Sequence, residues 1–449
     1  MNAKLLSKRD FLKLIGLGTG AALVHPSLTL AADIAETPDA STPFRVGQWL
    51  PSDQRHLEGW LSEQIARAEQ NPQPLHPVVQ ELKDIIDTDS RLYMLFTQMF
   101  RQVPFNTTPI GTKQVRDYQQ ALILINQVLT TAPEFNKTGL VGFPINAILD
   151  WAMGTQAGFA AFLNERVNVQ IKKILNEWGR FLGSPDSRYV LSDDPRHGWF
   201  GRNALEEMPH FAEDFKCDPT APYYGFSSWD DFFTREFREG IRPVAFPDDD
   251  SFIVNACESA PFKVARNVQR TNRFWIKAQP YSLMHMLAND EYVDRFVGGT
   301  VYQAFLSALS YHRWHSPISG RIVKRYIKEG TYYSQALSEG FDKSSPNNSQ
   351  GYLTEVATRA IMFIEADNPA IGLMCVMQIG MAEVSTCEMT VKEGQHVKKG
   401  DQLGMFHFGG STYCMIFGPQ VRLKFDLQGQ KPGLHSKNIK LNTAIARVI

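Results

Sequence analysis

Cysteine is scarce in this 449-residue chain, which contains five, an odd number. No two of them form a Cys-x-x-Cys pair, so their spacing argues against both a disulfide framework and a zinc site. An excess of charge of one sign is also lacking, because 46 Lys and Arg residues stand against 47 Asp and Glu residues. Without a basic excess or a long basic run, there is no electrostatic case for binding nucleic acid. A chain with 43% hydrophobic and 21% charged residues is ordinary globular protein, long enough for two domains.

The first 32 residues differ from the rest of the chain. Basic residues precede an apolar stretch at 14–30, which closes with Leu30-Ala31-Ala32, the layout of a cleavable export signal. The segment 7–13 resembles a twin-arginine export signal, although Lys8 stands where the first arginine is expected. The sequence therefore predicts an exported, periplasmic protein, with a cytoplasmic or membrane-associated protein as the alternative.

Residues 33–190 are predicted to form a helical N-terminal domain. Apolar residues recur at three- and four-residue spacing in segments such as 57–65 and 115–125, and proline clusters separate such segments. The longest predicted helix runs from Asn146 to Leu182, and its aromatic residues are expected to be core rather than a cofactor-stacking surface. We assign this domain no chemistry.

The second predicted domain, 191–449, is β-rich. The segment 251–258 predicts a strand that ends on a carboxylate, and 361–367 and 371–380 predict two buried strands. The polar segment 338–359 predicts a surface loop. The predicted fold class is therefore α+β, with a helical domain followed by a β-rich domain.

The segment 393–412 carries the strongest chemical signal. Its alternating apolar residues and its glycines predict short strands and tight turns, and it ends in Gly409-Gly410-Ser411-Thr412. Two glycines before a hydroxyl residue permit positive φ angles and an exposed carbonyl, so Ser411 is able to attack the carbonyl of Gly410. An ordinary hairpin turn is the alternative interpretation.

A second signal is Tyr-His-Arg-Trp-His-Ser-Pro at 311–317. Two histidines three residues apart suggest metal ligation, but no further ligand lies at a recognisable spacing, so no metal site is predicted. On the residues alone, His312 and His315 are more often structural than catalytic. Glu258, at the end of a predicted strand, is more often a solvated surface group.

Together these motifs resemble the phosphatidylserine decarboxylase family of pyruvoyl enzymes. The resemblance rests on Phe-Phe-x-Arg and Gly-x-Arg-Pro within 232–243, on Tyr-His-Arg-x-His-x-Pro at 311–317 and on Gly-Gly-Ser at 409–411. It implies that the chain cuts itself between Gly410 and Ser411, and that the serine becomes a covalent pyruvoyl cofactor. Attack on Gly410 would form an ester, elimination would leave dehydroalanine, and hydrolysis would release ammonia and leave the pyruvoyl group.

The resemblance also implies roles for individual residues. His315 would act as the general base that activates Ser411, and Glu258 would orient His315, although the family has aspartate at the position of Glu258. A substrate amine would form a Schiff base with the pyruvoyl ketone, which accepts the electron pair as carbon dioxide leaves. His312 would assist protonation of the substrate.

The substrate is inferred from a branch of the family. The helical region and the segments 221–226, 257–259, 363–368 and 404–411 resemble the branch that decarboxylates L-tryptophan. The resemblance therefore favours a free aromatic amino acid, tryptophan first. The alternatives are a phosphatidylserine decarboxylase that makes phosphatidylethanolamine and an unprocessed, non-enzymatic binding protein.

Two further expectations concern the β-rich domain. Glycine-separated strands ending at 397–401 resemble the β-sandwich of lipoyl- and biotin-carrying domains, without the usual Met-Lys context for lipoylation. The two chains produced by cleavage are expected to remain associated, and an oligomer is compatible with the sequence.

Overall fold

The structure is a computed structural model that describes residues 54–103, 115–135, 143–272, 279–306, 309–337, 347–383, 386–408 and 411–449. All of these residues belong to one compact unit, Ala40–Ile449. The export signal predicted for 1–32 lies outside the described residues, and the domain boundary near residue 190 stays a prediction.

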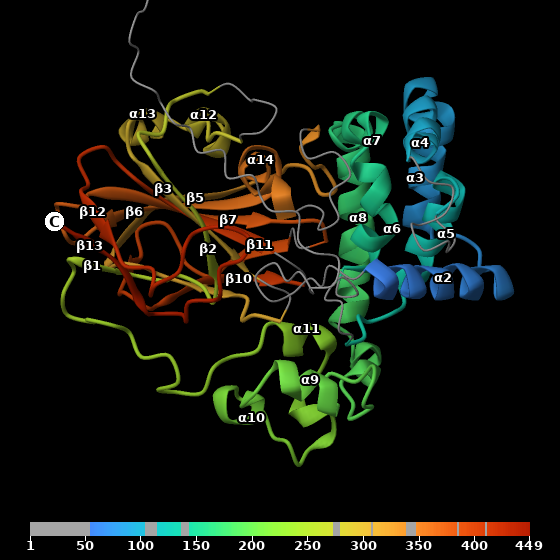
Figure 1. The fold of residues 1–449 in the computed structure, drawn as a ribbon, viewed down its shortest axis with the longest axis horizontal. Coiled ribbons are helices and arrows are strands. Elements are labelled where there is room, and N and C mark those ends of the chain that lie inside the picture. The colour runs from blue at the N-terminus through green and yellow to red at the C-terminus, as the bar shows by residue number, and fades with distance from the viewer. Residues whose placement is uncertain are drawn as a thin grey trace, which may run out of the picture. The chain divides into compact units, whose positions relative to one another are not determined.

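The first part of the chain is helical (Figure 1). Its helices are α2 (Gln54–Gln70), α3 (Pro77–Thr88), α4 (Ser90–Gln102), α5 (Tyr118–Val128), α6 (Pro144–Met153), α7 (Gln156–Phe162) and α8 (Glu165–Leu182). The later helices are short: α9 (Arg202–Glu207), α10 (Phe211–Asp214), α11 (Trp229–Phe233), α12 (Leu283–Met286), α13 (Val293–Phe296) and α14 (Gln350–Val356). Among the residues described, no helix is long and apolar enough to cross a membrane.

The single helix predicted from Asn146 to Leu182 is wrong, because the chain breaks there into α6, α7 and α8. The breaks follow from helix capping. The Thr155 side chain accepts a hydrogen bond from the backbone N–H of Gly158, and the Asn164 side chain accepts from Arg166 and Val167. Threonine and asparagine satisfy the free N–H groups of a new first turn, so each starts a helix where apolar periodicity alone predicts continuation.

The second part of the chain is mainly strands (Figure 1). They are β1 (Phe252–Val254), β2 (Ala260–Arg266), β3 (Thr300–Leu306), β4 (Arg313–His315), β5 (Gly320–Lys328), β6 (Arg359–Ala366), β7 (Leu373–Gly380), β8 (Thr386–Met389), β9 (His396–Val397), β10 (Gln402–His407), β11 (Ser411–Phe417), β12 (Leu423–Phe425) and β13 (Ala444–Val448). They form a seven-stranded sheet in the order β2-β3-β11-β7-β6-β5-β9 and two three-stranded sheets, β1-β13-β12 and β4-β10-β8. Neighbouring strands are antiparallel. The predicted α+β class is confirmed.

The two buried strands predicted at 361–367 and 371–380 are confirmed as β6 and β7. The strand predicted over 251–258 is shorter, since β1 ends at Val254 and the following residues form the turn before β2. The polar segment 338–359 is not entirely loop, because α14 occupies Gln350–Val356.

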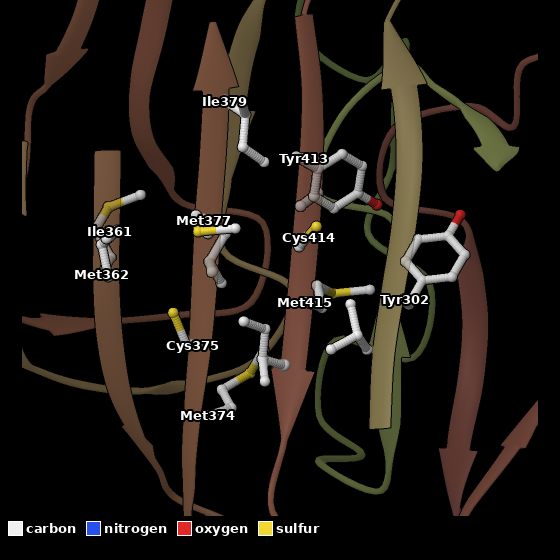
Figure 2. Packing of buried hydrophobic residues seen from close by; sticks show 14 of the residues in the cluster. Tyr302, Ile361, Met362, Met374, Cys375, Met377, Ile379, Tyr413, Cys414 and Met415 are labelled. Carbon is white, nitrogen blue, oxygen red and sulfur yellow. The ribbon is translucent and has the colours of Figure 1, made fainter. Parts of the chain in front are cut away.

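The centre of the seven-stranded sheet is buried on both faces. Every residue of β3, β7 and β11 is buried, so these strands are almost continuously apolar instead of alternating. Figure 2 shows side chains of this core, among them Tyr302, Met362, Met377 and Met415. Cys375 and Cys414 lie in the same core as free thiols, and burial raises their pKa. These cysteines are packing residues.

A second hydrophobic cluster joins the helices to the β-rich part. It consists mainly of side chains from the helical region, but it also contains Tyr332, Tyr333, Ala382 and Phe408. Trp178 of α8 is 1% exposed within this cluster, and its indole N–H donates to the backbone carbonyl of Thr131 at 2.8 Å. The helices therefore pack against residues that flank β7 and β11.

The packing of Trp178 predicts a large effect of truncation. Trp178→Ala should destabilise the protein by about 3–5 kcal/mol, because it leaves a cavity in a closely packed core. Urea unfolding followed by circular dichroism measures this loss. Val169→Ala is the matched control, because Val169 lies on the same helix but is 56% exposed, and it should change stability by less than about 0.5 kcal/mol. Equal effects of the two substitutions would contradict the packing described for Trp178.

Candidate active site

The predicted site residues lie on segments that meet at one end of the seven-stranded sheet. Ser411 is the first residue of β11, and it pairs with Leu306 and Gly380, the last residues of β3 and β7. The first residue of β2, Ala260, pairs with Phe305 at the same end. The turn before β2, which contains Glu258, and the segment after β3, which contains His312, therefore start from the end of the sheet where Ser411 lies.

Ser411 is completely buried, and its hydroxyl oxygen has no hydrogen-bond partner among the residues described. A buried polar group without a partner costs about 1–3 kcal/mol. A catalytic role is one physical explanation for such a group. The carbonyl that Ser411 is predicted to attack belongs to Gly410, which lies outside the described residues, as do the predicted positive φ angles of Gly409 and Gly410.

The backbone strain that is visible lies at Phe408, immediately before these glycines. Its φ angle is +44°, in the left-handed region that a bulky side chain rarely adopts. The ring is held by aromatic neighbours, with centroid distances of 4.4 Å to Trp178 and 4.9 Å to Trp229. Strained conformations cost about 1–3 kcal/mol and persist only where the surrounding packing enforces them. The sequence analysis missed Phe408, since nothing in its local pattern marks it.

His315 has partners at both ring nitrogens. Nδ1 lies 2.7 Å from the carbonyl oxygen of Gly400, and Nε2 lies 2.9 Å from the hydroxyl of Tyr311. Because a carbonyl only accepts, Nδ1 carries the proton, and Nε2 is left to accept from Tyr311. Burial lowers the pKa of His315, although the Gly400 carbonyl opposes this shift. The ring is therefore held neutral with its basic nitrogen on Tyr311, a residue of the same motif whose role sequence analysis did not identify.

Glu258 is buried, but its partners are not those expected. Its carboxylate forms an ion pair with Arg242 and accepts a hydrogen bond from the backbone N–H of Leu441 at 3.1 Å. It contacts neither nitrogen of His315, and both nitrogens are already engaged. Glu258 and Tyr311 do line the same cavity of about 340 Å³, so the structure brings Glu258 near the Tyr311–His315 pair without a hydrogen bond to the imidazole.

His312 connects the histidine motif to the segment before the predicted cleavage site. It is fully buried, and its ring stacks on Phe233 with a centroid distance of 4.0 Å. Its backbone carbonyl accepts from the N–H of Phe406 at 3.0 Å. Phe233 in turn lies 5.9 Å from Phe408, centroid to centroid. His312 is thereby packed into the aromatic group that holds Phe408.

A third histidine, His407, was missed by sequence analysis. Its Nδ1 lies 2.9 Å from Asp230 and its Nε2 lies 2.8 Å from Glu388, so it joins β10 to α11 and β8. Burial alone would lower the pKa of His407, but the two carboxylates outweigh it and raise the pKa to about 9. Within the described part of the chain, no group of three His, Cys, Asp or Glu residues could hold a metal ion.

Glu383 was also missed, and it is the other unusual acid near this end of the sheet. It is 3% exposed and follows β7 by three residues. One carboxyl oxygen accepts from the backbone N–H of Asn146 in the first turn of α6 at 2.8 Å. Burial raises the pKa of Glu383 to about 8, against the effect of that hydrogen bond. Only the fold brings residues 146 and 383 together, so no local motif signals this contact.

Comparison of the sequence with known proteins assigns the chain to a family. Two family models described as phosphatidylserine decarboxylase match residues 76–208 and 229–445. The chain belongs to the phosphatidylserine decarboxylase family and is a decarboxylase. An L-tryptophan decarboxylase of Psilocybe cubensis is 38% identical over 94% of this chain and 99% of the relative.

Two other relatives differ in how much of this chain they match. The decarboxylase iboD of Amanita muscaria is 44% identical over 68% of this chain and 91% of the relative. A phosphatidylserine decarboxylase proenzyme of Chlamydia felis is 30% identical over 47% of this chain and 68% of the relative. The similarity to the tryptophan enzyme therefore covers nearly the whole chain, whereas the similarity to this phospholipid enzyme covers about half.

The environment of His407 predicts a pH dependence of stability. The folded-state pKa of about 9 lies above the unfolded value near 6.5. The imidazolium therefore contributes its full stabilisation below about pH 6.5, and this contribution is lost as the pH rises through about 9. We expect wild-type stability to fall by roughly 1–3 kcal/mol over this range through His407.

Urea unfolding at a series of pH values measures this loss. His407→Gln should flatten the slope between pH 6.5 and 9. His396→Gln, a substitution at a histidine that pairs with Asp367 and is 46% exposed, should keep the wild-type slope. An unchanged slope in His407→Gln would show that the ion pairs with Asp230 and Glu388 do not form in solution.

Proposed function

We propose that this protein is a self-processed, pyruvoyl-dependent decarboxylase of free aromatic amino acids, with L-tryptophan as the favoured substrate. The observation that carries the substrate assignment is the similarity to an L-tryptophan decarboxylase over 94% of this chain, including the helical region. The phosphatidylserine decarboxylase proenzyme of Chlamydia felis matches only 47%. Phosphatidylserine, with phosphatidylethanolamine as the product, is the alternative substrate.

The residues around Ser411 fit the formation of a pyruvoyl group. Its hydroxyl is buried and unpartnered among the described residues, and it lies at the start of a strand, directly after the strained Phe408 and two glycines. A pyruvoyl group supplies a ketone that accepts the electron pair released when carbon dioxide leaves an amine-bearing substrate. The packing that enforces the strained conformation of Phe408 fixes the direction in which the chain enters the two glycines and Ser411.

The proton transfers are assigned to the histidine motif. Burial keeps His315 neutral, and the Gly400 carbonyl on Nδ1 fixes the tautomer whose Nε2 carries no proton. We assign acceptance of the Ser411 proton to this Nε2, in place of the hydrogen bond that it accepts from Tyr311, a residue that lines the same cavity as Glu258. In this proposal the Gly400 carbonyl orients the His315 ring. Glu258 acts indirectly, from the cavity that it lines together with Tyr311. His312, packed beside Phe233, is assigned to protonation of the substrate.

The two chains made by cleavage should stay together. β11 pairs along its whole length with β3 on one side and β7 on the other, and its side chains are buried. Separating a chain that begins at Ser411 would expose this core, so hydrophobic burial opposes dissociation.

The proposal also covers the N-terminal segment, the domain boundary and the type of β-sandwich. The N-terminal segment is proposed as an export signal for a periplasmic protein, on its basic and apolar pattern. The boundary between the domains 33–190 and 191–449 and the likeness of the β-rich part to lipoyl- and biotin-carrying β-sandwiches are also part of the proposal. Mass spectrometry of the mature protein reads both the signal cut and the mass of the terminus formed at Ser411.

Self-processing predicts clear results on denaturing gels. Wild-type protein should run as two chains, while Ser411→Ala should run as one intact chain because it lacks the nucleophile. His315→Ala should remain largely intact as well, and the control His396→Ala should be cleaved normally. A wild-type protein that stays whole during prolonged incubation would support the non-enzymatic binding protein instead, and normal cleavage of His315→Ala would remove this residue from the proposed role.

The substrate assignment predicts a preference for tryptophan. Purified, processed protein should release carbon dioxide from L-tryptophan and form tryptamine, and Ser411→Ala should release none. The same assay with phosphatidylserine vesicles tests the alternative. Turnover of the lipid without turnover of tryptophan would overturn the substrate assignment while leaving the pyruvoyl chemistry in place.

A further inference from the structure

A cavity of about 500 Å³ lies between α8 and the segments that flank β7 and β11. Trp178, Leu182 and Phe408 contribute apolar side chains to its wall, and Asp230, Glu383 and His407 contribute polar ones. Its volume is in the range of small-molecule sites, and apolar walls with a few polar groups are typical of such sites. Ser411, His315, His312 and Glu258 do not line it.

Two residues that line the cavity, Phe408 and Glu383, are connected to Ser411 by short stretches of chain. Phe408 precedes Ser411 by three residues, so their Cα atoms are at most about 11 Å apart. Glu383 follows Gly380 by three residues, and Gly380 is the strand partner of Ser411. A ligand in this cavity would therefore lie next to the segment that leads into the reacting residue and next to the segment that follows its strand partner.

Glu383 is the cavity residue with an unused hydrogen-bonding group. One carboxyl oxygen accepts from the N–H of Asn146, and the backbone N–H groups of Ile145 and of Glu383 itself also favour the ionised carboxylate. The other oxygen, Oε2, is fully buried and has no hydrogen bond to the residues described. A buried carboxyl group lacking a partner is costly. A ligand that supplies a donor or a positive charge would remove this cost.

The other charges around the cavity favour a cationic ligand at Glu383. His407 is cationic, but Asp230 and Glu388 both contact it and compensate its charge. Arg180 is 72% exposed and paired with Glu177. Burial keeps the Glu383 carboxyl neutral in the empty cavity, and a nearby positive charge favours its ionised form. The chemistry of Glu383 therefore matches an ammonium group.

We propose that this cavity binds the aromatic amino acid, with the ring against Trp178 and Phe408 and the α-ammonium on Glu383. An ammonium has no lone pair, so the substrate must lose a proton before its nitrogen attacks a ketone. As the ammonium binds, the neutral Glu383 carboxyl first loses its own proton to solvent: its O–H bond breaks, and a carboxylate paired with the ammonium remains. The carboxylate then accepts a proton from the ammonium: the N–H bond breaks, an O–H bond forms on Oε2, and the products are a neutral amine and a neutral carboxylic acid. Glu383 thus selects amines and prepares them for reaction. This inference rests on the proposed function and adds the site at which its substrate is recognised.

Binding to a protein that lacks the ketone tests the proposal without relying on activity. The full chain carrying Ser411→Ala would be titrated calorimetrically with tryptamine, which has the amine, and with indole-3-propionate, which has the same ring but no amine. We expect Ser411→Ala to bind both. Adding Glu383→Gln, which keeps an acceptor for Asn146, should weaken tryptamine binding about ten-fold or more, and it should change indole-3-propionate binding by less than about two-fold.

Two further variants control for structural effects. Glu383→Asp retains a carboxylate and should restore the preference for tryptamine over indole-3-propionate. Glu365→Gln replaces an exposed glutamate on β6 and should change neither affinity. Equal losses for both ligands in Glu383→Gln, or unchanged tryptamine binding, would overturn the assignment of the ammonium to Glu383. Binding of glycerophosphoserine in place of tryptamine would overturn the substrate class.

The outcomes also separate this inference from the proposed function. If the wild-type protein is cleaved and decarboxylates tryptophan, but Ser411→Ala fails to bind tryptamine, the cavity assignment fails and the function stands. If Ser411→Ala binds tryptamine through Glu383 but the wild-type chain stays whole, the site stands and self-processing fails.

Discussion

The conformation of Phe408 depends on contacts from three separate parts of the chain. Its positive φ angle is unfavourable for a bulky residue, so packing has to enforce it. Phe143 lies immediately before α6, Trp178 lies on α8, and Trp229 and Phe233 lie on α11. These rings hold the residue that leads into the two glycines and Ser411. The site is thus assembled by hydrophobic packing before any acid–base chemistry takes place.

This dependence gives the helical region a defined role. Sequence analysis assigned it no chemistry, but its residues contact the β-rich part at the two segments that flank Ser411 and its strand partner. Trp178 packs on Phe408, and the first turn of α6 donates a backbone N–H to Glu383. Trp178, Phe408 and Glu383 also line the 500 Å³ cavity. Similarity to the Psilocybe cubensis tryptophan decarboxylase extends through this region.

His315 and His407 have pKa values shifted in opposite directions by their surroundings. Burial lowers the pKa of His315, and the ring stays neutral because its partners, the Gly400 carbonyl and the Tyr311 hydroxyl, carry no full negative charge to outweigh burial. His407 is bracketed by two carboxylates, and its pKa rises to about 9. The first is suited to accept a proton, and the second to hold strands and a helix together by charge. Divergent pKa values among similar groups are a useful guide to acid–base roles.

The sequence by itself determined the α+β class, the buried strands β6 and β7, the family, and the motifs around Ser411 and His315. These features are local, since apolar periodicity and motif spacing are properties of short segments. It did not determine where the long helical stretch breaks, because capping by Thr155 and Asn164 competes with periodicity. Only the tertiary structure decided three contacts. Glu258 forms an ion pair with Arg242, the Tyr311 hydroxyl is hydrogen-bonded to Nε2 of His315, and Glu383 accepts a hydrogen bond from the backbone N–H of Asn146. The pairs Glu258–Arg242 and Glu383–Asn146 join different elements, and their geometry follows from how the sheets and helices pack. Even Tyr311 and His315, neighbours in one motif, meet only because the fold turns both side chains toward each other.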